Sequence, residues 1–141
     1  MEIEVISNPL KDFTVFGGVA YHDFSYENTT DDNGGFRYSG SPWLLNWWLS
    51  YHFDNTLKGL HFGFGGNYAS KNEIQNSPTA GIFYLPAYTV LNAAIGYDVK
   101  KYSIAFKVDN LNNEHYWQGY TTYNPQMLRQ FVGSLSYRFS F

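Results

Sequence analysis

Apolar and polar residues alternate along the carboxy-terminal segment of the chain. Every second residue from Phe131 is apolar or glycine, and the positions between them are polar apart from Val132. Successive side chains of a β-strand point to opposite sides, so this period of two predicts a strand with one apolar face. The apolar row consists of Phe131, Gly133, Leu135, Tyr137, Phe139 and Phe141, and the polar row of Gln130, Ser134, Ser136, Arg138 and Ser140.

The same period recurs upstream, and none of the apolar rows carries a charge. Large apolar residues stand on the opposite, polar side only at Phe16, Leu44 and Trp48. We therefore expect an all-β fold, an antiparallel up-and-down meander of about seven strands, the first at Ile3–Val5. The further rows are Phe13, Val15, Gly17, Val19, Tyr21; Trp43, Leu45, Trp47, Leu49, Tyr51, Phe53; Leu60, Phe62, Phe64, Gly66, Tyr68; Leu91, Ala93, Ile95, Tyr97, Val99; and Tyr102, Ile104, Phe106, Val108.

Short and long connections take turns between these strands. The short ones are Asn8–Asp12, Asp54–Gly59 and Lys100–Lys101, and the long ones are Glu27–Ser41, Lys71–Pro86 and Asn112–Gln126. Outer-membrane barrels place short turns at the periplasmic rim and long loops outside. This rule orients the chain, and the last strand then ends in the periplasm at Phe141.

Composition narrows the class of protein. Aromatic residues make up 21% of the chain and charged residues 15%, while mean hydropathy is −0.36. No apolar run approaches the roughly 18 residues that a spanning helix requires, which excludes a helical membrane protein. A net charge of −3 with scattered basic residues gives no stripe for nucleic acid. Without cysteine, disulfides and thiolate chemistry are impossible.

The apolar rows have two interpretations, because a lipid-facing row and a row facing the core of a soluble barrel share one pattern. Aromatic residues at the ends of the rows favour lipid, since interfacial girdles lie there. Small residues on the polar face suit a lumen that something else fills. The girdle candidates are Tyr21, Phe53, Tyr68, Tyr97, Tyr102 and Phe141, and the small residues are Gly18, Ala20, Gly63, Gly65, Ala94, Gly96, Ser103 and Ala105.

Three motifs resemble those of one family of outer-membrane proteins. The ending Leu135, Tyr137, Phe139 and Phe141 resembles the terminal strand that the barrel assembly machinery reads. Residues 108–116 are similar to the Asn-Leu-Phe-Asp/Asn-x-x-Tyr element of TonB-dependent receptors, with Asn112 where the family more often has Phe. Residues 85–93 resemble the Leu-Pro-x-Tyr entry to the third strand from the end in siderophore receptors.

The resemblance covers Ile3 to Phe141 and implies a role in transport across the outer membrane. It identifies residues 1–141 as the C-terminal portion of a transmembrane β-barrel of about twenty-two strands. The family's plug domain and TonB box are absent from this sequence, and so is a secretory leader, so we expect a piece of a receptor. The implied partners are outer-membrane lipid, the remaining strands, the plug, TonB through that plug, and an iron-siderophore or similar nutrient. No cofactor is expected.

Candidate ligand contacts are the aromatic and basic residues of the long loops, which combine flat apolar surface with hydrogen-bonding groups. Such side chains also pack on one another or sit in the interfacial belt, and that alternative stays open. An arginine could hold an anionic chelate through charge-assisted hydrogen bonds, or pair with a loop carboxylate. The candidates are Phe36, Arg37, Tyr38, Tyr84, Trp117, Tyr120, Tyr123 and Arg129.

The sequence gives less support to other classes of function. His52 and His61 stand near each other across the Asp54–Gly59 turn, but two histidines are an incomplete metal site, and wall residues facing a plug are the better interpretation. No phosphate loop or nucleophile motif indicates an enzyme. The alternatives are a small stand-alone outer-membrane barrel, which needs an eighth strand hidden in Lys71–Pro86, and a soluble ligand-binding barrel.

Overall fold

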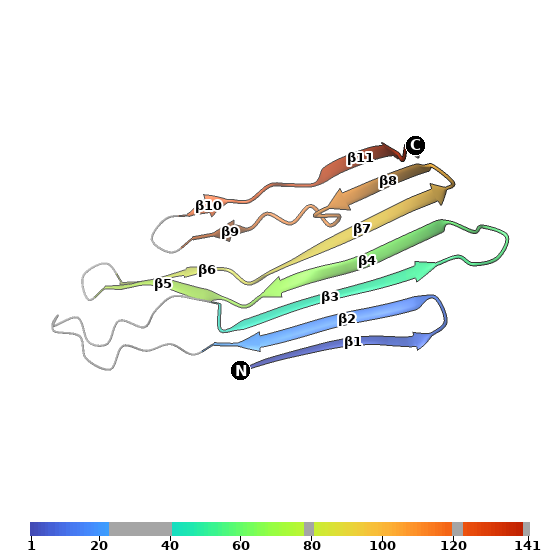
Figure 1. Ribbon diagram of the computed structural model, residues 1–141. Coiled ribbons are helices and arrows are strands. Elements are labelled where there is room, and N and C mark those ends of the chain that lie inside the picture. Colours follow the sequence, from blue (N-terminus) through green and yellow to red (C-terminus); the bar gives the residue numbers. More distant parts are fainter. Residues whose placement is uncertain (23–40, 78–80, 120–122, 140–141) are drawn as a thin grey trace.

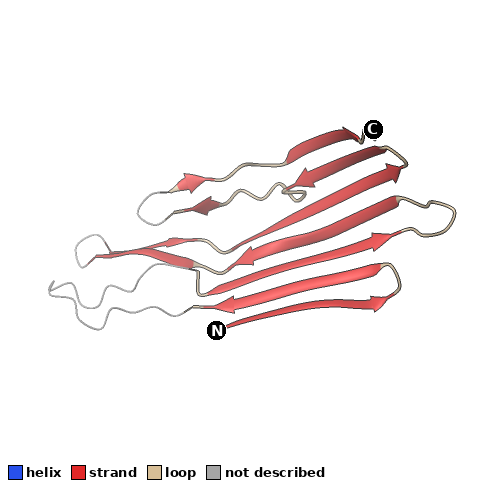
Figure 2. Cartoon of the chain, in the orientation of Figure 1, coloured by secondary structure: helices blue, strands red, loops and turns tan. Residues whose placement is uncertain are grey.

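The computed structural model describes residues 1–22, 41–77, 81–119 and 123–139. The described residues form strands and connections without a helix, and thus include no helix that is long and apolar enough to cross a membrane (Figure 2). Seven strands build one open antiparallel sheet with β1 and β11 at its two edges (Figure 1). In spatial order they are β1 (Glu2–Leu10), β2 (Phe13–Tyr21), β3 (Trp43–His52), β4 (Leu60–Ala69), β7 (Tyr88–Val99), β8 (Tyr102–Asp109) and β11 (Gln130–Tyr137).

Strand register keeps the predicted apolar rows on one face of the sheet. Val15 pairs with Leu49, which pairs with Phe64, and the row continues through Ala93 and Val108 to Phe131 on β11. One residue of slip would move each row to the opposite face, so the apolar pattern itself specifies this register. The all-β meander expected from the sequence is confirmed.

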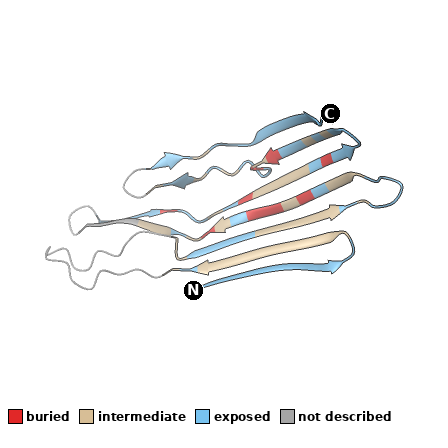
Figure 3. Ribbon diagram, in the orientation of Figure 1, coloured by how far each residue is buried: buried red, intermediate tan, exposed pale blue. Residues whose placement is uncertain are grey.

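Among the described residues, no second layer packs against the apolar face. Ile104 is 55% exposed and Leu135 72% exposed, and buried apolar side chains are few in the described part of the chain (Figure 3). An exposed apolar surface that extends over several strands marks contact with a non-aqueous partner. The exposed apolar face is therefore suited to contact with lipid.

The first strand and its turn differ from the prediction. β1 runs from Glu2 to Leu10, and only Lys11 and Asp12 form the turn, so Asn8 and Pro9 lie in the strand rather than in the connection. Pairing is irregular between Ser7 and Leu10. Proline lacks a backbone N–H and is tolerated at such an irregularity, where the ladder of hydrogen bonds is interrupted.

Two of the long connections contain hairpins that the period of two did not predict. β5 (Asn72–Ser77) pairs with β6 (Gly81–Leu85), and the short β9 (Trp117–Gln118) pairs with β10 (Asn124–Pro125). Both hairpins continue beyond the sheet at its long-loop end (Figure 1). Neither adds a strand to the wall, and β1 does not pair with β11. The alternative of a stand-alone barrel, which needs an eighth wall strand, is therefore wrong for the described residues.

Aromatic residues gather at the short-turn end of the apolar face. The rings of Tyr51 and Phe53 meet at 4.9 Å, and Tyr102 and Tyr137 meet at 4.9 Å across β8 and β11. Phe139 packs edge-on against Tyr137 at 4.6 Å, although β11 ends at Tyr137. Phe141, the last residue of the predicted assembly signal, lies outside the described residues.

Glycines on the polar face make room for large neighbours. A Cβ at Gly63 or Gly65 would overlap the indole of Trp48, and one at Gly96 would overlap the ring of His61. These rings therefore lie across the neighbouring strand instead of projecting into the lumen. The small residues of the polar face were expected to leave room for something else that fills the lumen. Some of them are instead covered by the chain's own side chains.

Candidate functional site

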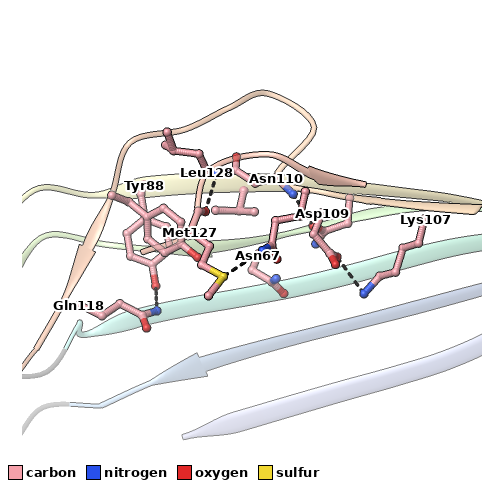
Figure 4. A pocket seen from close by; sticks show the side chains of 12 residues that line it. Asn67, Tyr88, Lys107, Asp109, Asn110, Gln118, Met127 and Leu128 are labelled. Carbon is pink, nitrogen blue, oxygen red and sulfur yellow. Dashed lines mark hydrogen bonds and ion pairs between the residues drawn. The ribbon is translucent and has the colours of Figure 1, made fainter. Parts of the chain in front are cut away.

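A hollow of about 470 Å³ lies where β7, β8 and β11 meet the loop that follows β8 (Figure 4). It opens on the polar face at the long-loop end of the sheet. Polar side chains dominate the lining: Asn67, Tyr88, Asn92, Lys107, Asp109, Asn110, Tyr116, Gln118 and Gln130, with Val90, Met127 and Leu128 between them.

Asn110 organises the wall of this hollow. It is 3% exposed and adopts a φ of 54°, a left-handed conformation in which asparagine is among the tolerated residues. Its Oδ1 accepts from the backbone N–H of Glu114 at 2.8 Å, and its Nδ2 donates to the carbonyls of Glu114 and Met127. The Asn110 N–H donates to Asn92 Oδ1 at 3.0 Å. The side chain and backbone of Asn110 thus tie both ends of the long loop to the sheet.

The next two asparagines replace strand pairing where β8 has ended. Asn112 accepts from the Leu91 N–H at 3.0 Å and donates to the Thr89 carbonyl at 2.8 Å, as a neighbouring strand would. Asn113 accepts from the Arg129 N–H at 3.1 Å. Phenylalanine at 112 could make neither amide hydrogen bond, so the departure from the family motif noted in the sequence has a structural reason.

Two tyrosines close one side of the hollow. The rings of Tyr88 and Tyr116 lie 4.4 Å apart, and Gln118 Nε2 donates to the Tyr88 hydroxyl at 2.6 Å. Burial and the neighbouring Tyr88 raise the pKa of Tyr116, so the Tyr116 phenol stays protonated at neutral pH. The pair therefore presents flat apolar surface together with hydrogen-bonding hydroxyl groups.

The charges in the hollow neutralise each other. Lys107 Nζ lies 2.8 Å from Asp109 Oδ1, so these two residues form an ion pair on the polar face. Gln130 Nε2 contacts the Met127 sulfur at 2.9 Å. The site is suited to hydrogen-bonding a polar, weakly charged ligand or protein segment against aromatic surface.

Four of the residues predicted from the loops are described by the structure, and they lie outside the lining of this hollow. Tyr84 is on β6, Trp117 on β9, Tyr123 immediately before β10 and Arg129 immediately before β11, and all four are described. The backbone of Arg129 binds Asn113, which fixes the residue near the base of the loop. Phe36, Arg37, Tyr38 and Tyr120 lie outside the described residues.

An aromatic contact joins the two long-loop hairpins. Phe83 of β6 meets the Tyr123 ring at 4.7 Å, and the adjacent Tyr84 carries Lys71 Nζ over its ring at 4.0 Å from the centroid. Tyr84 and Tyr123 are 38% and 46% exposed, so both keep surface available to a ligand. The structure thus brings two of the predicted residues to one part of the outer end.

Sequence reasoning missed the amide part of the site. Asn67 and Asn92 follow the alternating pattern as ordinary lumen residues, and Gln118 and Met127 belong to a loop without a period. The available signal was the run Asn110, Asn112 and Asn113 after β8, since asparagine tolerates left-handed backbone and bonds to nearby backbone groups. These asparagines also belong to the family motif of residues 108–116.

The histidines of the short-turn end have partners in the wall. His52 stacks on His61 with ring centroids 5.4 Å apart, and His61 Nδ1 lies 3.5 Å from Asp98 Oδ2. Within the described ranges no cluster of three or more His, Cys, Asp or Glu residues is arranged to hold a metal ion.

Comparisons with known proteins agree with this architecture. The ferrichrome outer membrane transporter/phage receptor of Escherichia coli K12 is 28% identical over 99% of this chain and 19% of its own length. The ferric-catecholate import receptor Fiu of E. coli K12 superposes with a TM-score of 0.80 at 21% identity over 98% of this chain and 20% of that one. The ferripyoverdine receptor of Pseudomonas aeruginosa gives 0.76 at 19% identity over 96% and 19%.

The matches cover nearly all of this chain but only a small part of each relative. The chain spans about one fifth of the length of the relatives it matches. The two solved structures are receptors, and at these identities they show a shared fold. A family model, "TonB dependent receptor-like, beta-barrel", matches residues 1–111. The chain therefore belongs to the TonB-dependent receptor family of outer-membrane proteins, as part of its β-barrel.

Proposed function

We propose that this chain forms the C-terminal wall and outer loops of a receptor that imports an iron-siderophore complex. The observation that carries the proposal is the family match over a sheet whose apolar face is exposed and whose polar face bears a structured hollow. The relatives are named for ferrichrome, ferric-catecholate and ferripyoverdine, so an iron chelate is the ligand class in common. This role is transport rather than catalysis.

The open sheet indicates that the complete receptor has further strands. β1 and β11 each leave one edge without a partner in the described structure. A backbone group left unpaired in the bilayer costs several kcal/mol, so we infer that further strands close the barrel on both sides. A plug in the lumen would contact the polar face, and TonB would act through that plug. The barrel assembly machinery and outer-membrane lipid complete the proposed partners.

The ligand contacts belong to the long-loop end. Tyr84, Trp117, Tyr123 and Arg129 remain our candidates among described residues, and Phe36, Arg37, Tyr38 and Tyr120 among the others. Tyr84 and Tyr123 have the strongest support, because Phe83 contacts Tyr123 and Lys71 lies over the Tyr84 ring, which places both tyrosines at the outer hairpins with exposed surface. Aromatic surface with phenol hydroxyls and a nearby cation suits a chelate that carries carbonyl or catecholate oxygens.

The experiment is iron-limited growth of the host with the gene for the complete receptor deleted and restored. Growth is measured on iron supplied as ferrichrome, a catecholate chelate or ferripyoverdine. Restored use of one chelate by the wild-type gene supports the proposal, and a Tyr84→Ala/Tyr123→Ala variant should bind that chelate less tightly at unchanged receptor abundance. Equal growth of deleted and restored strains on all three chelates and on a wider siderophore panel would contradict the proposal.

A further inference from the structure

Three cations gather at the short-turn end of β7, β8 and β11. Lys100 and Lys101 form the β7–β8 turn, and Arg138 follows the last residue of β11. They line a hollow of about 590 Å³, in which Asp98 is the single acid. The Asp98 carboxylate already lies 3.5 Å from His61 Nδ1. The hollow therefore carries an excess of positive charge.

Strand register places this hollow on the polar face of the sheet. Asp98 pairs with Ser103, and Ser103 pairs with Ser136, in a row that alternates with the apolar one. Arg138 follows Ser136 by two residues and Lys101 precedes Ser103 by two, so both belong to the same face as the serines. The short serine side chains leave space beside the cations. Because the opposite face is the one suited to lipid, an occupant of the hollow has to come from the lumen.

Two of the cations face each other across the strands. The Arg138 N–H donates to the Lys101 carbonyl at 2.8 Å, which extends the β8–β11 ladder one step beyond the Tyr102–Tyr137 pair. Like charges directly opposite each other on neighbouring strands are destabilising. A carboxylate between Lys101 and Arg138 would turn this repulsion into charge-assisted hydrogen bonds.

The adjacent short turns are built differently. Lys11 Nζ lies 2.6 Å from Asp54 Oδ2, so a carboxylate of the β3–β4 turn neutralises the lysine of the β1–β2 turn. No ion pair involving Lys100, Lys101 or Arg138 is present within residues 1–22, 41–77, 81–119 and 123–139. The positive charge of this corner is thus available to carboxylates from another part of the receptor.

The arrangement of the charges indicates what kind of anion fits. The cations come from the β7–β8 turn and from the end of β11, and neighbouring strands lie about 4.8 Å apart, so the charge is spread out rather than directed at one point. A single small anion meets only part of this spread, whereas an extended peptide segment with two or more carboxylates meets all of it. The hydroxyls of Ser103 and Ser136 supply further donors to carboxylate oxygens.

We propose that Lys100, Lys101 and Arg138 dock an acidic peptide segment of the same receptor, which lies inside the lumen and carries at least two carboxylates. This chain spans about one fifth of the length of the relatives it matches, so a receptor of that size has most of its chain outside this sheet. The inference rests on the proposed function, in which a plug contacts the polar face, and adds where the contact is made and by which charges.

Zero-length cross-linking of the complete, purified receptor tests this contact. A water-soluble carbodiimide joins a lysine amine to a carboxylate that touches it, and mass spectrometry of the digested protein identifies the pair. Lys11 and Asp54 are the internal control, because their ion pair should be joined in the same sample. We expect Lys100 or Lys101 to be joined to a carboxylate outside the barrel wall. If both lysines are joined to nothing, or only to Asp98 or another wall strand, the proposal is wrong.

An equal mixture of unlabelled and isotope-labelled receptor identifies the source of the carboxylate. A contact within one chain gives cross-linked peptides in which both halves carry the same label. Pairs that combine the two labels join two copies of the receptor, and their predominance would contradict a segment in the same lumen.

A pair of variants gives a second measurement on the cross-linked segment. Lys101→Gln/Arg138→Gln should speed its hydrogen exchange by roughly two- to fivefold for each cation removed. Lys11→Gln/Lys58→Gln removes the same number of positive charges from neighbouring turns and should leave that exchange unchanged. Equal acceleration in both variants would show a diffuse effect of charge and overturn the site. All these measurements are made without chelate, so a failure of the transport proposal would leave their outcome unaffected.

Discussion

The indole of Trp48 on β3 lies across Gly63 on β4, so closely that a Cβ at residue 63 would overlap the ring. Gly65 lies beneath the other edge of the same indole. A large apolar residue on the polar face is thereby held flat against the wall instead of standing in the lumen.

Gly63→Ala should destabilise the folded barrel because the added methyl group displaces Trp48. Overpacking of this kind costs about 1 to 3 kcal/mol. Gly17→Ala is the matched control, since a Cβ there meets nothing within 4 Å, and it should be close to neutral. Urea unfolding of the detergent-solubilised receptor measures both. If Trp48→Ala does not rescue Gly63→Ala, the ring is not the cause.

Asn110 should be the most sensitive residue of the long-loop end. Asn110→Ala removes the amide hydrogen bonds from a buried position and places alanine at positive φ, for a loss of about 2 to 4 kcal/mol. Asn110→Gly tolerates the backbone and loses only the hydrogen bonds, so it should cost less, about 1 to 3 kcal/mol. Unfolding of both variants gives the comparison. Equal losses would show that the left-handed backbone contributes nothing.

The contact between the two outer hairpins should be energetically coupled. Phe83→Ala and Tyr123→Ala each remove one ring of the 4.7 Å pair, and the double variant should lose less than the sum of the two. The expected coupling is about 0.5 to 1.5 kcal/mol. Hydrogen exchange of the β5–β6 hairpin measures its opening in the four proteins. Additive effects would mean that the hairpins are independent.

The ion pair between the short turns gives a pH dependence. The hydrogen bond and charge of Lys11 lower the pKa of Asp54 below its usual 3.8, and Asp54 raises the pKa of Lys11 above its usual 10.5. The contribution of Asp54 to the free energy of unfolding is present above pH 3.8 and is lost as pH falls through the lowered pKa of the folded state. The contribution of Lys11 is present below pH 10.5 and is lost as pH rises through its raised pKa.

The effect should be small because both groups are exposed to solvent and salt. Wild type and Asp54→Asn should therefore differ slightly in unfolding free energy at pH 7, and the difference should vanish as pH falls well below 3.8. Unfolding titrations at several pH values measure this. A difference that grows on acidification would contradict the assigned direction of the pKa shift.

The sequence predicted the sheet well because one physical constraint repeats along it. The row from Val15 to Phe131 and the short Lys100–Lys101 turn follow from alternation and chain reversal alone. Hairpin β5–β6 was not predicted because it lies outside the seven-stranded sheet and carries no alternating apolar row. Likewise, the amide cluster at Asn110 depends on bonds to Glu114 and Met127, which no local pattern reveals.

The central claim is that the apolar rows face lipid and the interleaved positions face the lumen. The chain has no cysteine, so single cysteines placed along β8 can be spin-labelled cleanly. The measurement is accessibility of labels at Ile104, Ala105, Phe106 and Lys107 to oxygen and to a water-soluble nickel chelate in the reconstituted receptor. We predict that oxygen reaches 104 and 106 preferentially, while the nickel chelate reaches 105 and 107. The reverse pattern, or equal access at all four positions, would contradict the account.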